Sequence, residues 1–303
     1  MDRFTELQKQ IDDLKAEVTG LKRELLLLSS EGARGVHSLE ALLRQQGLPI
    51  IHHGDHSQIV FPPNMASGEL MSFYRLMRRY SFRLFMRDLI QMPSGNDFNA
   101  LTRYCSLRTV RAYMSSLAEL GVVSTEGGGY RLPRAVPSFG PTLEWFVCEI
   151  FRREFLAPAL FNVHLQNTRF GGDYDVISII AGHPVYVEVK SSPPRGVEHQ
   201  AVNAFLRRTG DLRPHVAILL VDTELRMADK LAPLLSEGLE LEGKKGPRWA
   251  VLRLVDEIFH VRHSIYLMNS RKGVYSNLRT CFRDFLLWER KETGTQSPVL
   301  FSE

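Results

Sequence analysis

The sequence predicts an α/β fold whose central part follows the order helix, three strands, helix, strand. Four segments rich in Val, Ile or Leu are bounded by Gly and Pro or by polar turns, which is typical of strands. Two neighbouring segments repeat their apolar side chains at helical spacing. The predicted helices cover residues 143–155 and 198–208, and the predicted strands cover 159–169, 171–180, 184–190 and 216–221.

Composition is typical of a globular protein, and the length is enough for two domains and some linking structure. The 303 residues carry a net charge of +4, and 44% of them are hydrophobic. No run of about 18 apolar residues is present, which predicts no membrane span. The chain is charged from Asp2 onward, so no signal peptide is expected. Three widely spaced cysteines (Cys105, Cys148 and Cys281) fit no zinc spacing and indicate reduced thiols. We therefore expect a cytoplasmic protein.

Residues 1–30 carry a heptad repeat that predicts a coiled coil. Apolar residues alternate at spacings of three and four, with leucine at every d position and β-branched Ile11 and Val18 at a positions. This combination favours a parallel two-stranded coil and therefore a homodimer. The alternative is an amphipathic helix packed on its own chain, although such helices usually have a wider apolar face.

Residues 31–67 are expected to form a connector. It contains a short helix over 38–46 and a small hairpin over 49–61 that turns at Gly54. The hairpin carries His52, His53 and His56, which could be read as metal ligands. Adjacent strand residues face opposite sides, however, and turns are commonly polar, so we favour a polar turn.

Residues 68–135 contain an excess of arginine. Ten arginines and no lysine stand against four acidic residues over 70–135, a local charge of 10 − 4 = +6. A localised basic segment is the usual footprint of nucleic-acid binding, whereas the alternative is a solvated helix face. We expect a helix over 68–91, a short helix capped by Asp97, a helix over 107–120 capped by Ser106, and a hairpin over 122–132.

The stretch SLRTVRAYMSSLAELGVV, which begins at Ser106, resembles the winged helix-turn-helix family. In that family the second helix of the pair enters the major groove of double-stranded DNA. The resemblance implies DNA contacts from Arg108, Thr109 and Arg111 at the start of that helix, with Arg131 on the wing. Winged helices also dock proteins, so a protein partner at this module is the alternative.

The domain over 141–290 follows a proline-rich linker. Thr142 is expected to cap its first helix, which carries Glu144 and Glu149. Beyond the central elements we expect a helix over 225–236, a strand over 249–255, a strand or hairpin arm over 259–268, a final helix over 275–288 and a polar tail over 291–303.

Charged residues interrupt two of the apolar strands. Asp175 opens the strand before the turn at 181–184, and Glu188 and Lys190 lie on the strand after it. Side chains alternate along a strand, so Glu188 and Lys190 face the same side, and pairing of the strands would bring Asp175 near Glu188. Two carboxylates beside a lysine form a plausible site for a hard cation.

This arrangement resembles the PD-(D/E)xK nuclease superfamily, over roughly residues 142–222. The resemblance implies a restriction-endonuclease-like core in which Asp175 and Glu188 bind Mg²⁺, with Mn²⁺ as a substitute, and Lys190 positions the attacking water. It further implies a supporting acid on the first helix, Glu144 or Glu149. Asp173 remains an alternative to Asp175 as a ligand, and Gln200 lies where several subfamilies place a glutamine near the site. The proline of the family name is absent, and Gly172 precedes Asp173 instead.

The expected function is therefore that of a homodimeric, metal-dependent DNA endonuclease acting in restriction, defence or repair. One alternative is a DNA-binding or regulatory protein whose nuclease-like fold is inactive. Another is a nuclease effector whose winged helix docks a partner protein.

Overall fold

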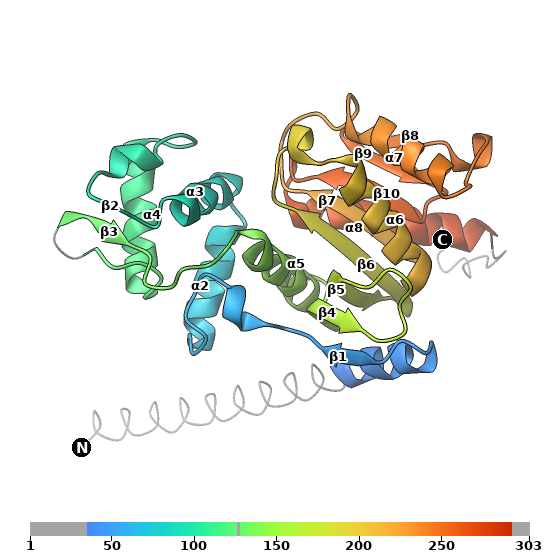
Figure 1. The fold of residues 1–303 in the computed structure, drawn as a ribbon, viewed down its shortest axis with the longest axis horizontal. Helices are drawn as coiled ribbons and strands as arrows, with labels where there is room; N and C mark the ends of the chain where they lie inside the picture. The colour runs from blue at the N-terminus through green and yellow to red at the C-terminus, as the bar shows by residue number, and fades with distance from the viewer. Residues whose placement is uncertain (1–34, 126–127, 293–303) are drawn as a thin grey trace, which may run out of the picture.

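The computed structural model describes residues 35–125 and 128–292, and it confirms an α/β fold (Figure 1). One eight-stranded sheet has the order β1-β4-β5-β6-β7-β10-β9-β8. The predicted coiled coil lies outside the described residues. The strands are β1 (Ile50–His52), β4 (Ala159–Leu165), β5 (Asp173–Ile180), β6 (His183–Lys190), β7 (Val216–Val221), β8 (Leu252–Val255), β9 (Ile258–Val261) and β10 (Ile265–Asn269).

The sheet is mixed. Strands β4, β5 and β6 are antiparallel neighbours, whereas β6, β7 and β10 are parallel. The tight turn between β5 and β6 contains Ala181 and Gly182, both with positive φ, which suits a two-residue hairpin loop. Helices connect the parallel strands, as the right-handed crossover of α/β proteins requires long connections.

Helices cover both faces of the sheet. Helices α5 (Gly140–Glu154) and α8 (Val274–Glu292) pack on one face, and α6 (His199–Leu212), α7 (Leu231–Leu241) and the helix of residues 35–45 pack on the other. Val187 lies in the first apolar cluster and Tyr186 in the second, so β6 is buried on both sides. The order α5-β4-β5-β6-α6-β7 is the one predicted for the central part of the chain.

A helical module follows β1 in the chain and lies beside α5 (Figure 1). Its single predicted helix over 68–91 is wrong, because the chain breaks at Arg78 and Arg79, and Arg79 has an extended conformation. Phe73 and Phe82 would point in opposite directions on one continuous helix. The break brings their ring centroids within 5.9 Å in the shared core. The module contains α2 (Ser67–Met77), α3 (Tyr80–Gln91), β2 (Ser94–Gly95), η2 (Phe98–Leu101), α4 (Leu107–Glu119) and β3 (Tyr130–Arg131).

Both predicted caps in the module are confirmed. The Asp97 carboxylate accepts a hydrogen bond at the start of η2, and the Ser106 hydroxyl does so at the start of α4. The predicted hairpin over 122–132 is confirmed only in part, because β3 pairs mainly with β2. Ser124 joins β3 through an isolated bridge to Arg131.

The module and the sheet share one apolar core. Trp145 of α5 packs against both Phe61 and Phe73, with ring centroids 4.8 and 5.8 Å away. A buried ion network adds to this contact at the end of β7. The Asp222 carboxylate accepts hydrogen bonds from Arg83 (2.7 Å) and Arg87 (2.6 Å) of α3, and its backbone N–H donates to the Lys190 carbonyl (2.8 Å). Through Asp222, helix α3 of the module is therefore linked to Lys190 at the end of β6.

Two further expectations require correction, and a third, left open between a strand and a hairpin arm, is decided by the structure. The predicted hairpin over 49–61 does not form, because β1 pairs with β4 at the edge of the large sheet. The helix expected over 225–236 begins at Leu231, since the Glu257 carboxylate accepts hydrogen bonds from the backbone of Met227 and Ala228 and holds that segment as a loop. The arm expected over 259–268 is the β9–β10 hairpin. Among the described residues, no helix has the length and apolar character of a membrane span.

Candidate functional site

The predicted acidic residues meet where two strands separate. The β5–β6 ladder runs from the turn as far as the pair Val176 and Val187. Beyond it, β6 stays paired with β7 as far as Lys190. We call the place where β5 and β6 separate the β5–β6 fork. There the Asp175 carboxylate, in place of a β5 backbone carbonyl, accepts a hydrogen bond from the Val189 N–H at 2.7 Å. Asp175 is only 8% exposed, so this fork holds a buried carboxylate between the two strands.

Glu188 lies on the other side of the fork and is surrounded by cations. Its carboxylate accepts hydrogen bonds from Lys190 Nζ at 2.6 Å and from Arg208 Nη1 at 3.0 Å, and the Tyr186 hydroxyl also donates to it. Glu188 is 1% exposed, which explains why charge-assisted hydrogen bonds surround it. The predicted pairing of Glu188 with Lys190 on one face is therefore observed.

Arg208 is a site residue that the sequence reasoning missed. It extends from α6 and lies against Gly172, where an added Cβ would come within 2.8 Å of its guanidinium. The small residues Ala201 and Ala204 precede it at helical spacing on the wall of the site. That stripe of small residues ending in arginine was the available signal, but a helical arginine ordinarily indicates only a solvated face.

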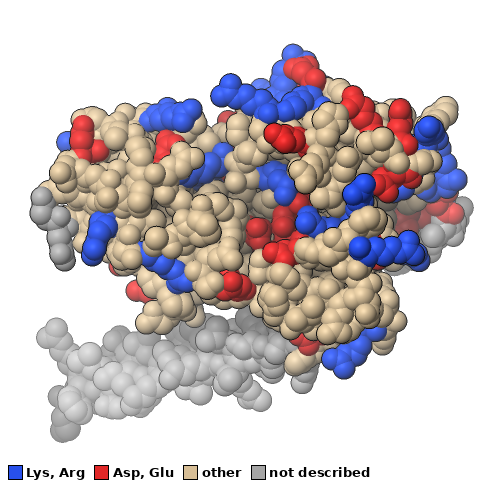
Figure 2. All heavy atoms as spheres, viewed as in Figure 1, with Lys and Arg blue, Asp and Glu red and all other residues tan. Residues whose placement is uncertain are grey.

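Gln200 of α6 lines the same surface depression as the lysine. Together with Lys190, Glu188 and Arg208 it lines an open depression of about 290 Å³ between the end of β6 and α6. The depression is polar and accessible to solvent. Figure 2 shows acidic and basic side chains close together near the middle of the face drawn there, where the helical module meets the sheet.

The structure separates the two acids of the first helix. Glu144 lies near the fork. The charges of Glu188 and Lys190 affect the pKa of Glu144, and the charge of Glu144 affects the pKa of Asp175. Glu149 instead pairs with Arg152 at 3.0 Å and Arg153 at 2.6 Å. Five helical positions rotate a side chain by about 140°, so both acids cannot face the fork. The expectation of Glu149 as a ligand is wrong.

Asp173 is also near the site but has a partner of its own. Its carboxylate lies 2.5 Å from His164 Nε2, and the His164 ring stacks on His52 with centroids 3.8 Å apart. The Asp173 side chain, at the first residue of β5, is 45% exposed. Asp175 is therefore the more buried and more central of the two aspartates, and Asp173 contributes negative charge beside Glu144.

The electrostatics of the fork favour binding of a cation. Burial raises the pKa of Asp175 well above its ordinary value, and the nearby Glu188 and Glu144 raise it further. Burial raises the pKa of Glu144 to about 7, with a further contribution from Glu188. Burial by itself would lower the pKa of Lys190, but Glu188 and Asp175 outweigh it and raise that pKa. The raised pKa values show that burial and neighbouring acids destabilise the charged forms of Asp175 and Glu144, and a bound cation would stabilise those charged forms.

A hard divalent cation fits this donor set. Asp175, Glu188 and Glu144 offer only oxygen ligands, which suits Mg²⁺ or Mn²⁺. Among the described residues, the group of three whose ligand atoms all lie within 4.8 Å is a different one, His260, His263 and Asp284. Asp175, Glu188 and Glu144 do not meet that distance, so one ion could not contact all three carboxylates directly as they lie here, and at least one of them would reach it through a water that Mg²⁺ retains.

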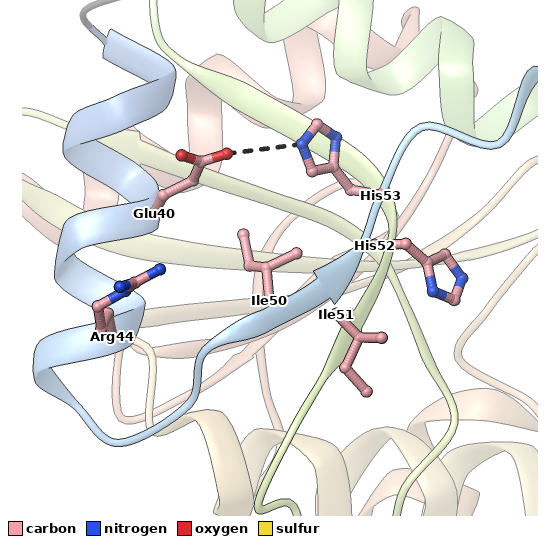
Figure 3. Close-up of a pocket in the computed structure, with 6 residues that line it drawn as sticks. All are labelled: Glu40, Arg44, Ile50, Ile51, His52 and His53. Atoms are coloured by element: carbon pink, nitrogen blue, oxygen red, sulfur yellow. Dashed lines mark ion pairs between the residues drawn. The ribbon is translucent and has the colours of Figure 1, made fainter.

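The three histidines of the connector have different neighbours and do not converge. Figure 3 shows that His53 points toward Glu40, with 3.7 Å between Nε2 and Oε1, while His52 points away from it. These residues line a depression of about 380 Å³ between the helix of residues 35–45 and β1. His56 instead packs edge-on against Phe161, with ring centroids 5.4 Å apart.

Of the four residues expected to contact DNA, three are exposed on the surface and one takes part in a helix cap. Arg108, Arg111 and Arg131 are exposed, and no hydrogen bond or ion pair joins their side chains to other described residues. Thr109 takes part in the helix cap, with its hydroxyl 3.0 Å from Ser106 Oγ. Four arginines of the basic segment are used within the protein itself: Arg78, Arg83, Arg87 and Arg134.

The raised pKa of Glu144 predicts a stability difference that depends on pH. Its folded-state pKa of about 7 exceeds the ordinary value of 4.5, so the folded protein holds a proton that the unfolded chain has lost between these pH values. The free energy of unfolding should therefore fall as pH rises from about 4.5 to 7. We expect Glu144→Gln to be about 1–3 kcal/mol more stable than the wild type at pH 8 and equal to it at pH 4.

Urea denaturation at both pH values measures this difference. Glu69→Gln serves as the control. Glu69 is exposed in the first turn of α2, where its carboxylate accepts a hydrogen bond from the Ala66 N–H, so this variant should show no gain in the free energy of unfolding at pH 8. An equal effect of Glu144→Gln at pH 4 and pH 8 would contradict the raised pKa.

Comparison with known proteins gives one distant structural likeness. No protein-family model and no curated protein sequence matches this chain. The chain is similar to the solved structure titled "Crystal structure of protein VC1899 from Vibrio cholerae", with 15% sequence identity and a TM-score of 0.43. The match covers 76% of this chain and 58% of that one. At this TM-score the likeness is too partial to assign a fold family or a function.

Proposed function

We propose that this protein is a metal-dependent nuclease that hydrolyses phosphodiester bonds at the β5–β6 fork. The observation that carries the proposal is the meeting of Asp175, Glu188 and Lys190 where the strands separate, with Glu144 approaching from α5. The raised pKa of Asp175, caused by burial and by neighbouring acids, supports a role for the fork in binding a cation.

The proposed roles follow from the chemistry of each side chain. Asp175 and Glu188 would hold the divalent ion, and Glu144 would support it directly or through water. A bound Mg²⁺ would lower the pKa of a water and offset charge on the phosphate. Lys190 stays protonated because Glu188 and Asp175 raise its pKa, so it suits stabilisation of an anionic transition state. Arg208 and Gln200 line the same depression and are suited to orienting a phosphate and a water.

The helical module is proposed to bring duplex DNA to this site. Ser106 caps α4, and exposed Arg108 and Arg111 lie in its first turns, which is where a recognition helix contacts a major groove. We further propose that residues 1–30 pair two chains, so that a homodimer carries two sites for the two strands of a duplex.

A cleavage assay tests the proposal. Full-length protein is incubated with supercoiled plasmid and Mg²⁺, and nicked or linear product is expected to form, with none in the presence of EDTA. A single-stranded oligonucleotide and an RNA of the same sequence are compared in parallel to identify the substrate class. Absence of metal-dependent cleavage of all three substrates, with both Mg²⁺ and Mn²⁺, would remove the nuclease assignment.

One observation favours a second candidate function, that of a DNA-binding protein with an inactive fork. Glu188 already has two cationic partners, Lys190 and Arg208, and a metal ion would have to compete with them. In that case the protein would bind duplex DNA without cutting it. Isothermal titration with Mg²⁺ would then give the same result for the wild type and for Asp175→Asn, because neither would bind the ion at the fork.

Loss of two exposed arginines should weaken duplex binding. We expect Arg108→Ala with Arg111→Ala to reduce affinity by about ten- to a hundredfold and to lower the slope of log affinity against log salt by about 2, because two phosphate contacts are lost. Fluorescence anisotropy at several salt concentrations measures both quantities. Arg226→Ala together with Arg248→Ala, exposed arginines outside the module, is the control. An unchanged salt slope in the module variant would instead favour protein docking at this surface.

A further inference from the structure

Two histidines and an aspartate converge at a place remote in sequence from the fork. His260 belongs to β9, His263 lies in the turn to β10, and Asp284 belongs to α8, which packs over that end of the sheet. One ligand atom from each of the three side chains lies within 4.8 Å of the others. The proposed nuclease reaction uses none of these residues.

The contacts within the cluster orient its ligand atoms. His263 Nδ1 lies 2.7 Å from Asp284 Oδ2, and the same oxygen accepts a hydrogen bond from the Tyr266 hydroxyl at 2.8 Å. The backbone N–H of His263 donates to His260 Nδ1 at 3.2 Å. His260 therefore carries a lone pair on Nδ1, and this lone pair faces the turn that holds His263.

We propose that His260, His263 and Asp284 form a second metal site, for a transition-metal ion of the Zn²⁺ class. Imidazole and carboxylate are the ligands that Zn²⁺ accepts in sites with three protein ligands and one water. Binding would replace the proton shared by His263 and Asp284 and the long hydrogen bond to His260. Tyr266 would remain as the outer partner that orients the carboxylate.

The cluster differs from the fork in the ion that it should select. The fork offers only oxygen ligands, which suit Mg²⁺, whereas two imidazoles favour Zn²⁺ or Co²⁺. A bound ion would join the β9–β10 turn to α8, and we expect it to act by fastening this helix to the sheet. The inference is independent of the proposed nuclease function, since it concerns other residues and is measured by metal binding.

A similar group on the same helix provides a matched control. His183 lies 3.0 Å from Glu289 of α8, and the His215 ring packs against His183 with centroids 5.0 Å apart. This second pair of histidines with an acid does not bring its ligand atoms together within the distance met by the cluster of His260, His263 and Asp284. Removal of His183 should therefore leave metal binding at the cluster unchanged.

The test is titration of the full-length, metal-stripped protein with Co²⁺, followed by displacement with Zn²⁺. We expect visible absorption bands that saturate near one ion per chain and disappear on addition of Zn²⁺, and a higher thermal midpoint with Zn²⁺. His263→Gln should weaken Co²⁺ binding by more than about tenfold, the least expected even for a supporting residue of a metal site. His183→Gln should bind as the wild type does.

His263 is the variant of choice because its side chain is 32% exposed, so its replacement disturbs the fold less than that of buried His260. Circular dichroism establishes that each variant is folded. Saturation without visible bands, or equal Co²⁺ affinity in His263→Gln and the wild type, would overturn the proposal. Plasmid cleavage by His263→Gln is expected at the wild-type rate. The nuclease proposal is therefore unaffected whether or not this variant loses Co²⁺ binding.

Discussion

Replacing Asp175 with asparagine is expected to reduce the rate of Mg²⁺-dependent plasmid cleavage by at least about 100-fold, the scale of removing a key electrostatic group from an active site. Asparagine has the same size and can still accept the hydrogen bond from the Val189 N–H, so the fork should keep its shape. It lacks the charge that holds a divalent ion. Lys190→Met should lower the rate on a similar scale without abolishing metal binding, because the lysine contributes charge and is not a metal ligand.

Glu149→Gln is the matched control for these variants. Glu149 is a mostly buried acid of α5 that pairs with Arg152 and Arg153 away from the fork, so its replacement should leave the cleavage rate within about threefold of the wild type, the size of an ordinary non-catalytic effect. Calorimetric titration with Mg²⁺ accompanies the rate measurement. Equal rates for Asp175→Asn and the wild type would place the reaction elsewhere in the protein.

Replacing Asp222 with alanine is expected to lower the free energy of unfolding by about 3–5 kcal/mol. Asp222 is fully buried, and burial by itself would raise its pKa, but Arg83 and Arg87 outweigh that effect and lower it. Without the carboxylate, the guanidinium of Arg83, which is 1% exposed, would remain charged in the core with no counterion. Urea denaturation followed by circular dichroism measures the loss.

Asp229→Ala provides the comparison at the surface. Asp229 pairs with Arg226 at 3.5 Å, and both side chains are about two-thirds exposed, so the expected loss is at most about 1 kcal/mol. A triple variant that replaces Asp222, Arg83 and Arg87 with apolar residues should recover part of the stability, because no buried charge is then left unpaired. A loss at Asp222 no larger than that at Asp229 would show that the network does not fasten the module to the sheet.

The same network connects the helical module with the fork. The Asp222 N–H donates to the Lys190 carbonyl, and the Asp222 carboxylate binds two arginines of α3. Loss of Asp222 should therefore disturb the end of β6 as well as the contact between module and sheet. For this reason the effect of Asp222→Ala is better measured as a change in the free energy of unfolding than as a change in the cleavage rate alone.

Local patterns in the sequence determined much of the fold and part of the site. Strand alternation places Glu188 and Lys190 on one face, and the short turn after Ile180 brings Asp175 near Glu188. Asp97 and Ser106 identify helix starts through hydrogen bonds that span two or three residues. These features depend on neighbours along the chain, so their signals are present in the sequence.

Only the tertiary structure decided which distant groups meet. It separated Glu144 from Glu149, added Arg208 to the fork, broke the helix at Arg79 and joined Arg83 to Asp222 across 139 positions. Each of these outcomes depends on how elements pack, and an arginine or glutamate on a helix has the same local pattern whether it faces solvent or a buried partner. Periodicity along one element gives the face on which a side chain lies, whereas the packing of several elements determines what that face contacts.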